Sequence, residues 1–243
     1  MSQRAVGSKS WFLCGSGDRR LRLIRLATEK FAVICLLLGL FVIPAQAAPT
    51  KILVFGDSLV SGYGLKPSEA FPPMLGIRLQ ADGYDVLIAN GGVPGETTTL
   101  AFARLEAALE SRPDLVILEL GANDMLNNLP IKTTRENLKK MLQAFRQAGA
   151  YVILAGMVAK GDLPSAYRRR FDALYPELAR TYTIALYPNF LEGVGGNPAL
   201  TQEGGLHPNA KGVQAIVTHM APIVEQALAQ MGVKPRRSSL IGE

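Results

Sequence analysis

The nine residues KILVFGDSL, numbered 51–59, place a serine directly behind a short aliphatic run. An unbroken aliphatic run that is followed by Gly is typical of a buried parallel strand. A serine at the turn from such a strand into a helix exposes its hydroxyl, and the start of the helix directs backbone N–H groups toward an anion. Taken alone, a Gly-Asp-Ser tripeptide is more often a turn or a helix N-cap.

The same alternation of aliphatic and amphipathic runs continues along the chain. Short aliphatic runs, each typical of a buried strand, occupy residues 52–55, 86–89, 115–120, 152–155 and 184–186. Helical patterns lie between or after them, at about residues 69–81, 98–111, 134–148, 163–181 and 209–231. This order predicts one α/β domain with a parallel sheet and right-handed crossovers. Ligands of such sheets bind at the carboxyl ends of the strands, so we expect the functional residues there.

The first 47 residues resemble a secretory leader. Seven Lys and Arg residues precede an uncharged apolar run at 31–43, and Ala45-Gln46-Ala47 supplies small residues for cleavage. An uncleaved anchor or a buried helix is the alternative, but the 13-residue run is shorter than the roughly 20 residues that span a bilayer. We therefore predict a cleaved signal peptide at 1–47, a domain at 48–233 and a frayed polar tail at 234–243.

Removal of the leader changes the charge and the cysteine content. Of 26 Lys and Arg residues 19 remain, and of 20 Asp and Glu residues 18 remain, so the net charge falls from +6 to about +1. The basic character thus belongs to the leader and gives no reason to expect a nucleic-acid partner. Both cysteines, Cys14 and Cys35, lie in the predicted leader and would be removed by its cleavage. His207 and His219 are the only histidines. Disulfides, thiolate metal sites and His-rich zinc sites are therefore not expected, and we predict no metal.

Three further segments, each behind a strand or before a helix, carry residues suited to catalysis. In the segment 90–97, Gly95 lets a backbone N–H approach a reacting oxygen closely, although a plain Gly-rich turn is the alternative. In the segment 121–124, Asn123 is able to donate a side-chain hydrogen bond to an oxyanion, or it is a turn residue. His207 sits in a loop before the last helix, where an imidazole suits a general base, whereas His219 lies inside that helix.

Ser58, Gly95, Asn123 and His207 follow one another in the order of the four blocks that name the SGNH (GDSL) hydrolases, which the chain resembles over nearly all of residues 51–230. The segments 56–65 and 167–179 are most similar to the bacterial subgroup of acyl-CoA thioesterase I, lysophospholipase L1 and arylesterases. The resemblance implies a flavodoxin-like three-layer α/β/α sandwich and a cofactor-free hydrolase. It also implies Ser58 as nucleophile, His207 as base, and an oxyanion hole formed by the N–H groups of Ser58 and Gly95 with the Asn123 side chain.

The chain departs from this pattern at the acid that orients the histidine. The subgroup has Asp three residues before the histidine, where this chain has Gly204, and the nearest carboxylate is Glu203. In unrelated triads the loss of this acid costs about 10⁴ in turnover. Three interpretations stay open: Glu203 serves as an offset acid, Ser58 and His207 act as a dyad, or the site is disabled and the domain binds an envelope ligand.

The resemblance favours an exported esterase or thioesterase acting on aryl or short acyl esters, acyl thioesters or lysophospholipids. A deacetylase of carbohydrate or cell-envelope polymers is the rival enzyme. Apolar residues behind Asn123 and behind the fourth strand suit acyl or aryl groups if they line the site, and otherwise only pack the loops. We expect a monomer without a membrane anchor after signal cleavage, located in the periplasm or secreted.

Overall fold

A computed structural model describes residues 48–236 of the chain. Its centre is a sheet of five parallel strands in the order β2-β1-β3-β4-β5. The strands are β1 (Thr50–Gly56), β2 (Val86–Gly92), β3 (Leu115–Glu119), β4 (Tyr151–Ala155) and β5 (Ala185–Tyr187). The inner strands β1, β3 and β4 are almost entirely buried, as their unbroken aliphatic sequences predict.

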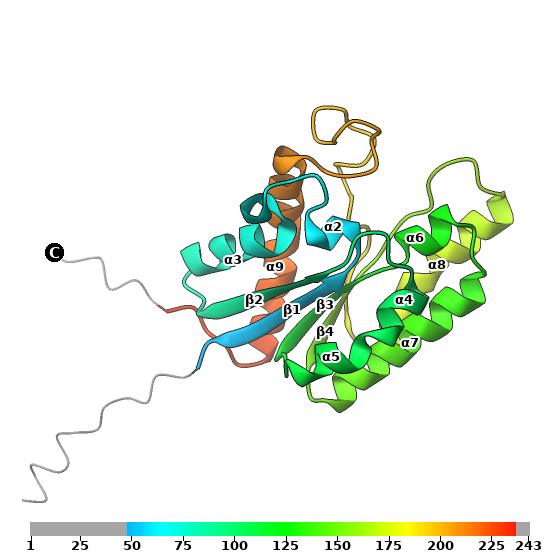
Figure 1. Cartoon of the computed structure of the whole chain (residues 1–243). Coiled ribbons are helices and arrows are strands. Elements are labelled where there is room, and N and C mark those ends of the chain that lie inside the picture. The colour runs from blue at the N-terminus through cyan, green and yellow to red at the C-terminus, as the bar shows by residue number, and fades with distance from the viewer. Residues whose placement is uncertain (1–47, 237–243) are drawn as a thin grey trace, which may run out of the picture. The chain divides into compact units, whose positions relative to one another are not determined.

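Helices cover both faces of this sheet (Figure 1). On one face lie α2 (Ser58–Ser61), α3 (Phe71–Ala81) and α9 (Ala210–Gln230), and α3 packs along α9. The other face carries α4 (Thr98–Ala103), α5 (Leu105–Glu110), α6 (Ala122–Leu126), α7 (Ile131–Gln147) and α8 (Ser165–Tyr182). A 3₁₀ turn, η1 (Pro67–Glu69), precedes α3. The predicted three-layer α/β/α sandwich with a central parallel sheet is confirmed.

The structure differs from the expected pattern mainly in its short helices. The helix expected at 98–111 is two helices that meet at Arg104, whose side chain turns inward to the Glu96 carboxylate and over the Phe55 ring. The helix start expected at Ser58 is the four-residue α2, and the short helix α6 that follows β3 was not predicted. Each is too short for hydrophobic periodicity to reveal.

The strand order places a topological switch point beside the first strand. From β1 the chain moves to one side to form β2 and then returns across β1 to form β3. Loops at the carboxyl ends of β1 and β3 therefore diverge, and this arrangement leaves a crevice where ligands bind in open α/β sheets. Ser58 follows β1 and Asn123 follows β3, so both lie at this edge.

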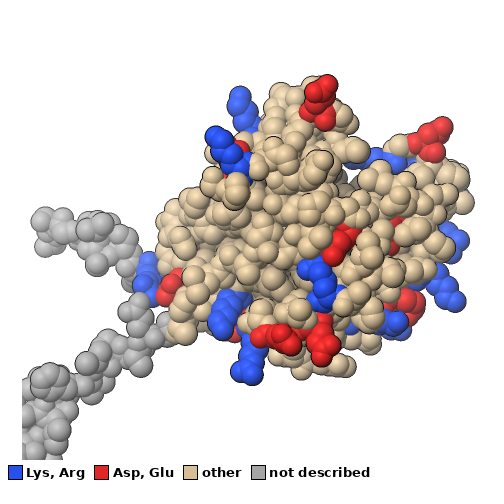
Figure 2. All heavy atoms as spheres, viewed as in Figure 1, with Lys and Arg blue, Asp and Glu red and all other residues tan. Residues whose placement is uncertain are grey.

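Lys and Arg side chains are interspersed with Asp and Glu on the face shown in Figure 2. Within residues 48–236, no helix is long and apolar enough to cross a bilayer. The predicted signal peptide at 1–47 and most of the predicted tail at 234–243 lie outside the described residues.

Candidate active site

Ser58 is the first residue of α2, immediately after β1 (Figure 1). Asp57 caps this helix, because its Oδ1 accepts a hydrogen bond of 3.0 Å from the Leu59 N–H. Gly56 before it has no room for a side chain, since a Cβ there would lie 2.4 Å from Val60 Cγ2 and 2.5 Å from the Glu119 carbonyl oxygen. At the first helical position, the Ser58 N–H has no carbonyl partner within the helix.

His207 reaches Ser58 from the long loop between β5 and α9. Its Nε2 lies 2.9 Å from the Ser58 Oγ. Two contacts fix this end of the loop: Asn209 caps α9 by accepting from the Gly212 N–H, and Thr201 forms a β-bridge with Pro208. Residues separated by 149 positions in the sequence thus lie within hydrogen-bonding distance, as the predicted nucleophile and base would have to.

The surroundings of His207 contain an aromatic ring in place of an acid. The ring centroid of Tyr63 lies 5.0 Å from that of His207, at an interplanar angle of 42°. Gln202 connects the two loops, because its Nε2 donates to the carbonyl oxygens of Tyr63 and Pro208 at 2.7 and 2.9 Å. Partial burial lowers the pKa of His207 below its ordinary 6.5, because the charged imidazolium loses solvation.

Glu203, the candidate offset acid, is exposed and is not brought to the imidazole. Within the described part of the chain, neither a hydrogen bond nor an ion pair joins Glu203 to His207, and Nδ1 of His207 has no hydrogen-bond partner. Gly204, which replaces the usual acid, has a φ of +87° and open space around it. His219 lies on the exposed side of α9, away from this pair.

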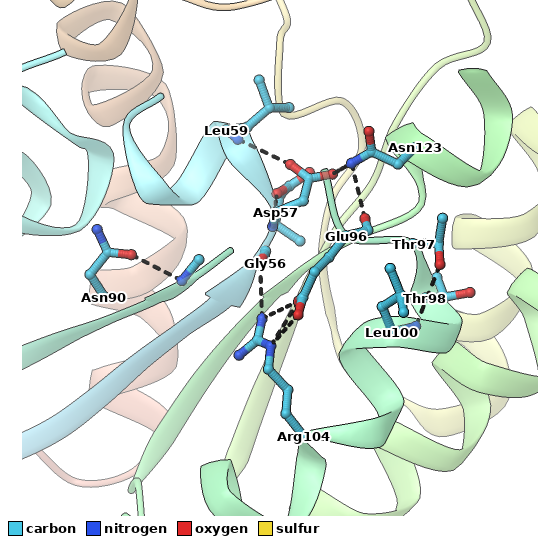
Figure 3. A network of polar contacts seen from close by, with 12 residues as sticks. Gly56, Asp57, Leu59, Asn90, Glu96, Thr97, Thr98, Leu100, Arg104 and Asn123 are labelled. Carbon is cyan, nitrogen blue, oxygen red and sulfur yellow. Dashed lines mark hydrogen bonds and ion pairs between the residues drawn. The ribbon is translucent and has the colours of Figure 1, made fainter. Parts of the chain in front are cut away.

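The predicted oxyanion donors line the same cavity as Ser58. Gly95 adopts a φ of +78°, and its N–H has no hydrogen-bond partner among residues 48–236. The Nδ2 of Asn123 donates to Asp57 Oδ2 at 3.0 Å and to the Glu96 carbonyl oxygen at 2.9 Å (Figure 3). An oxyanion would therefore compete with the Glu96 carbonyl for one of the two Asn123 N–H groups.

The cavity around the Ser58–His207 pair measures about 430 Å³ and is mainly apolar. Its apolar side chains come from the loops after β1, β3 and β4 and from the loop that carries His207: Leu59, Tyr63, Met125, Leu126, Met157, Val158, Leu191 and Leu206. Lys160 is the charged residue among its lining. Of the apolar residues behind Asn123 and behind β4, Met125, Leu126, Met157 and Val158 line this cavity, whereas Leu129, Pro130, Ile131, Leu163 and Pro164 do not.

Two buried carboxyl groups lie directly behind the nucleophile. Asp57 and Glu119 are both fully buried, and the Asp57 backbone N–H donates to Glu119 Oε2 at 3.4 Å. Burial raises the pKa of Asp57 to about 6 and the pKa of Glu119 well above its usual range, and the negative charge of Asp57 adds to the effect on Glu119. Sequence reasoning missed this pair, although a Glu that ends the aliphatic strand LVILE is itself a signal.

Among the described residues, no group of three or more His, Cys, Asp or Glu side chains is placed to hold a metal ion. The site brings together the Ser58 hydroxyl, the His207 imidazole, the backbone N–H of Gly95 and a mainly apolar cavity. These are the components of acyl transfer through a serine nucleophile.

Comparison with known proteins agrees with this chemistry. The profile of the GDSL-like lipase/acylhydrolase family matches residues 54–215, from within β1 to within α9. The chain belongs to this family. The match spans Ser58, Gly95, Asn123 and His207, so the resemblance drawn from the sequence is confirmed at the level of the family.

Named relatives of this GDSL-like hydrolase are ester hydrolases. It is 35% identical over 192 residues to esterase TesA of Pseudomonas aeruginosa, covering 79% of this chain and 96% of the relative. It is 38% identical over 165 residues to an arylesterase of Vibrio mimicus, covering 68% and 82%. Thioesterase 1/protease 1/lysophospholipase L1 of Escherichia coli K12 is 33% identical over 196 residues, covering 76% and 92%.

Solved structures show the same fold. The crystal structure of TesA superposes with a TM-score of 0.71 at 34% identity, covering 74% of this chain and all of that one. The esterase AlinE4, described as a member of the SGNH-hydrolase family, has a TM-score of 0.63 at 38% identity and covers 76% and 99%. This GDSL-like hydrolase is therefore an enzyme that acts on ester bonds.

Proposed function

We propose that this GDSL-like hydrolase cleaves carboxylic esters and thioesters through an acyl-enzyme formed on Ser58. The observation that carries the proposal is the 2.9 Å contact between Ser58 Oγ and His207 Nε2, at the wall of an apolar cavity of about 430 Å³. A hydroxyl becomes a competent nucleophile when a base accepts its proton during attack, and the lowered pKa of His207 leaves its Nε2 free to do so at neutral pH.

In the first half-reaction, Ser58 Oγ bonds to the substrate carbonyl carbon while its proton moves to His207 Nε2. The carbonyl oxygen takes up the negative charge, and the N–H groups of Ser58, Gly95 and Asn123 stabilise it. The bond to the alcohol or thiol then breaks, and His207 returns the proton to the departing oxygen or sulfur.

In the second half-reaction, water attacks the Ser58 ester. His207 accepts a proton from the water, the oxyanion forms again, and the Ser58 Oγ leaves with the proton from Nε2. The free acid and the original hydroxyl are restored, so the cycle requires no cofactor.

We further propose that Ser58 and His207 work as a dyad. Because Nε2 accepts from the serine, the imidazole proton resides on Nδ1, which has no protein partner in the described residues and is free to bind water. The Tyr63 ring and the Gln202 amide, rather than an acid, then hold the ring in place.

Aryl and short to medium acyl groups are the proposed substrates, including acyl thioesters and lysophospholipids. Support comes from the apolar lining contributed by Met125, Leu126, Met157 and Val158. The named relatives, which include an arylesterase and a thioesterase/lysophospholipase, point to the same classes. We also propose export to the periplasm or beyond after cleavage behind Ala47, which N-terminal sequencing of the exported protein tests.

Hydrolysis of p-nitrophenyl butyrate by protein purified from Ala48 onward tests the activity. The wild type should hydrolyse this ester. Ser58→Ala should lose at least about 10³-fold in kcat, and its residual activity would come from substrate binding and the oxyanion hole. Retained activity of Ser58→Ala in a clean preparation would contradict the mechanism.

A series of p-nitrophenyl acetate, butyrate and octanoate, with an acetylated sugar beside it, tests the substrate class. We expect kcat/KM to rise from acetate to the longer acyl groups, because each methylene that enters an apolar cavity adds about 0.8 kcal/mol of burial. A preference for the acetylated sugar would favour the deacetylase instead.

A further inference from the structure

Behind the nucleophile lies the pair of buried carboxyl groups that the acyl-transfer steps do not use. Asp57 and Glu119 each have an accessible fraction of 0%, and they come from the ends of the neighbouring strands β1 and β3. Burying a charge without a partner costs free energy. Which of the two carboxyl groups carries a proton therefore matters for the stability of the fold.

The contacts of Asp57 are those of an ionised carboxylate. Its Oδ1 accepts from the Leu59 N–H at 3.0 Å, and its Oδ2 accepts from the Asn123 side chain at 3.0 Å (Figure 3). Both donors belong to the catalytic apparatus, since Leu59 N–H lies in the turn that presents Ser58 and Asn123 is an oxyanion donor. Two donated hydrogen bonds favour the charged form of the acid.

The contacts of Glu119 are those of a neutral acid. Oε1 accepts a hydrogen bond from none of the described N–H or O–H donors, and Oε2 accepts only a long one, 3.4 Å, from the Asp57 N–H. Within residues 48–236 no Lys or Arg forms an ion pair with it. The nearby Arg104 is paired with Glu96 at 2.6 Å, and the Tyr175 hydroxyl donates to the Leu120 carbonyl oxygen.

Glu119 therefore has neither a cation nor a close N–H donor to stabilise a negative charge, whereas Asp57 has two donors. We propose that Glu119 is protonated and donates its O–H to the Asp57 carboxylate, and that the pair positions Asn123 and the Ser58 turn for catalysis. Glu119 and Asp57 are positioning residues in this proposal, because neither touches the substrate.

The directions of the two pKa shifts agree with this placement of the proton. Burial raises the pKa of Asp57 to about 6, and burial together with the charge of Asp57 holds the pKa of Glu119 well above its usual range. Both shifts favour a proton within the pair, and the two donors to Asp57 favour the negative charge on that side chain. The titratable and charged groups around it are Asp124 on α6, Tyr175 on α8, and Glu96 and Arg104 beside α4.

Infrared spectroscopy at pH 7 tests the proton directly and independently of any activity. A protonated carboxyl group in an apolar site gives a carbonyl band separate from those of ionised carboxylates. We expect this band in the wild type, its loss in Glu119→Gln, and its retention in Glu106→Gln, a control on the exposed side of α5. Absence of the band from the wild type, or its loss only in Asp57→Asn, would overturn the assignment.

Steady-state kinetics with p-nitrophenyl butyrate test the positioning role, and this arm rests on the proposed function. Glu119→Gln keeps an N–H donor toward Asp57 and should retain kcat within about threefold, whereas Glu119→Leu should lose about tenfold or more in kcat with KM little changed. In Asp57→Asn a side-chain amide faces the Asn123 amide, and kcat should fall by a factor similar to that in Glu119→Leu.

The infrared and the kinetic experiments test separate claims, and either claim can fail without the other. An inactive wild type that shows the infrared band would contradict the proposed function but would still support a protonated Glu119. Full kcat in both Glu119→Leu and Asp57→Asn would overturn the positioning role, and so would an equal loss in Glu119→Gln and Glu119→Leu.

Discussion

The imidazole of His207 lies between the Ser58 hydroxyl and the ring of Tyr63. The first contact is a hydrogen-bonding distance of 2.9 Å and the second a tilted ring packing at 5.0 Å. Aromatic pairs of this kind contribute about 0.5–1.5 kcal/mol beyond the area that they bury. Such packing restrains the orientation of the ring, but it cannot stabilise an imidazolium as a carboxylate does. Turnover should therefore be slower than in an enzyme with a complete triad.

Substitutions of Glu203 and Tyr63 distinguish these ways of orienting the histidine. Glu203→Gln should leave kcat/KM for p-nitrophenyl butyrate within about twofold, because the side chain is exposed and has no contact with His207. Tyr63→Ala should lower kcat/KM about tenfold, the loss of one aromatic contact. A steep loss in folded Glu203→Gln would instead identify Glu203 as an offset acid that reaches His207 during turnover.

Asp124 joins three helices beside the site. Its carboxylate accepts from the Thr98 N–H at 2.8 Å, from the Thr98 hydroxyl at 2.6 Å and from the Thr134 hydroxyl at 3.0 Å. These bonds tie α6, the helix that carries Asn123, to the start of α4 and to α7. A buried carboxylate with three donors is sensitive to the loss of any acceptor oxygen.

Asp124→Asn replaces one acceptor oxygen with an N–H donor that faces another donor. We expect the free energy of unfolding to fall by about 3 kcal/mol, because a buried polar contact becomes repulsive. Urea denaturation measures the change. Glu136→Gln, on the exposed side of α7, is the matched control and should change stability by less than about 0.5 kcal/mol. Equal stability of the two variants would contradict the role given to Asp124.

The burial and contacts of individual helices and strands explain which of them could be predicted from the sequence. The strands β1, β3 and β4 are buried on both faces, so their aliphatic runs identify them directly. The break at Arg104 depends on Glu96 and Phe55, which no local pattern brings to that side chain. Ser58 and His207 were predictable because each stands at a strand or helix end. The packing of Tyr63 on His207 and the hydrogen bond from Gln202 to the Tyr63 carbonyl were not, because they join segments that are distant in the sequence.

For the whole molecule, the buried acids make stability depend on pH in an unusual direction. Their pKa values are raised in the folded state, so the folded protein binds more protons than the unfolded chain above pH 4. Stability from these groups is therefore present at low pH and decreases as pH rises from about 4 through the folded pKa values. Ordinary paired carboxylates behave in the opposite way.

A comparison of variants isolates this effect from the other titrating groups. We expect the stability of the wild type relative to Glu119→Gln to decrease between pH 4.5 and pH 7.5, because the glutamine takes up no proton on folding. Chemical denaturation at both pH values measures the difference. A relative stability that rises with pH would mean that Glu119 is ionised in the folded protein.

The central claim is that Ser58, activated by His207, forms the covalent intermediate. Mass spectrometry after treatment with a fluorophosphonate measures it most directly, since the reagent phosphonylates an activated serine. We predict one adduct per molecule, mapped to Ser58, with its rate of formation lowered at least about 10²-fold in His207→Ala and no adduct at this position in Ser58→Ala. A folded wild type that remains unlabelled at Ser58, or labels equally fast without His207, would contradict the account.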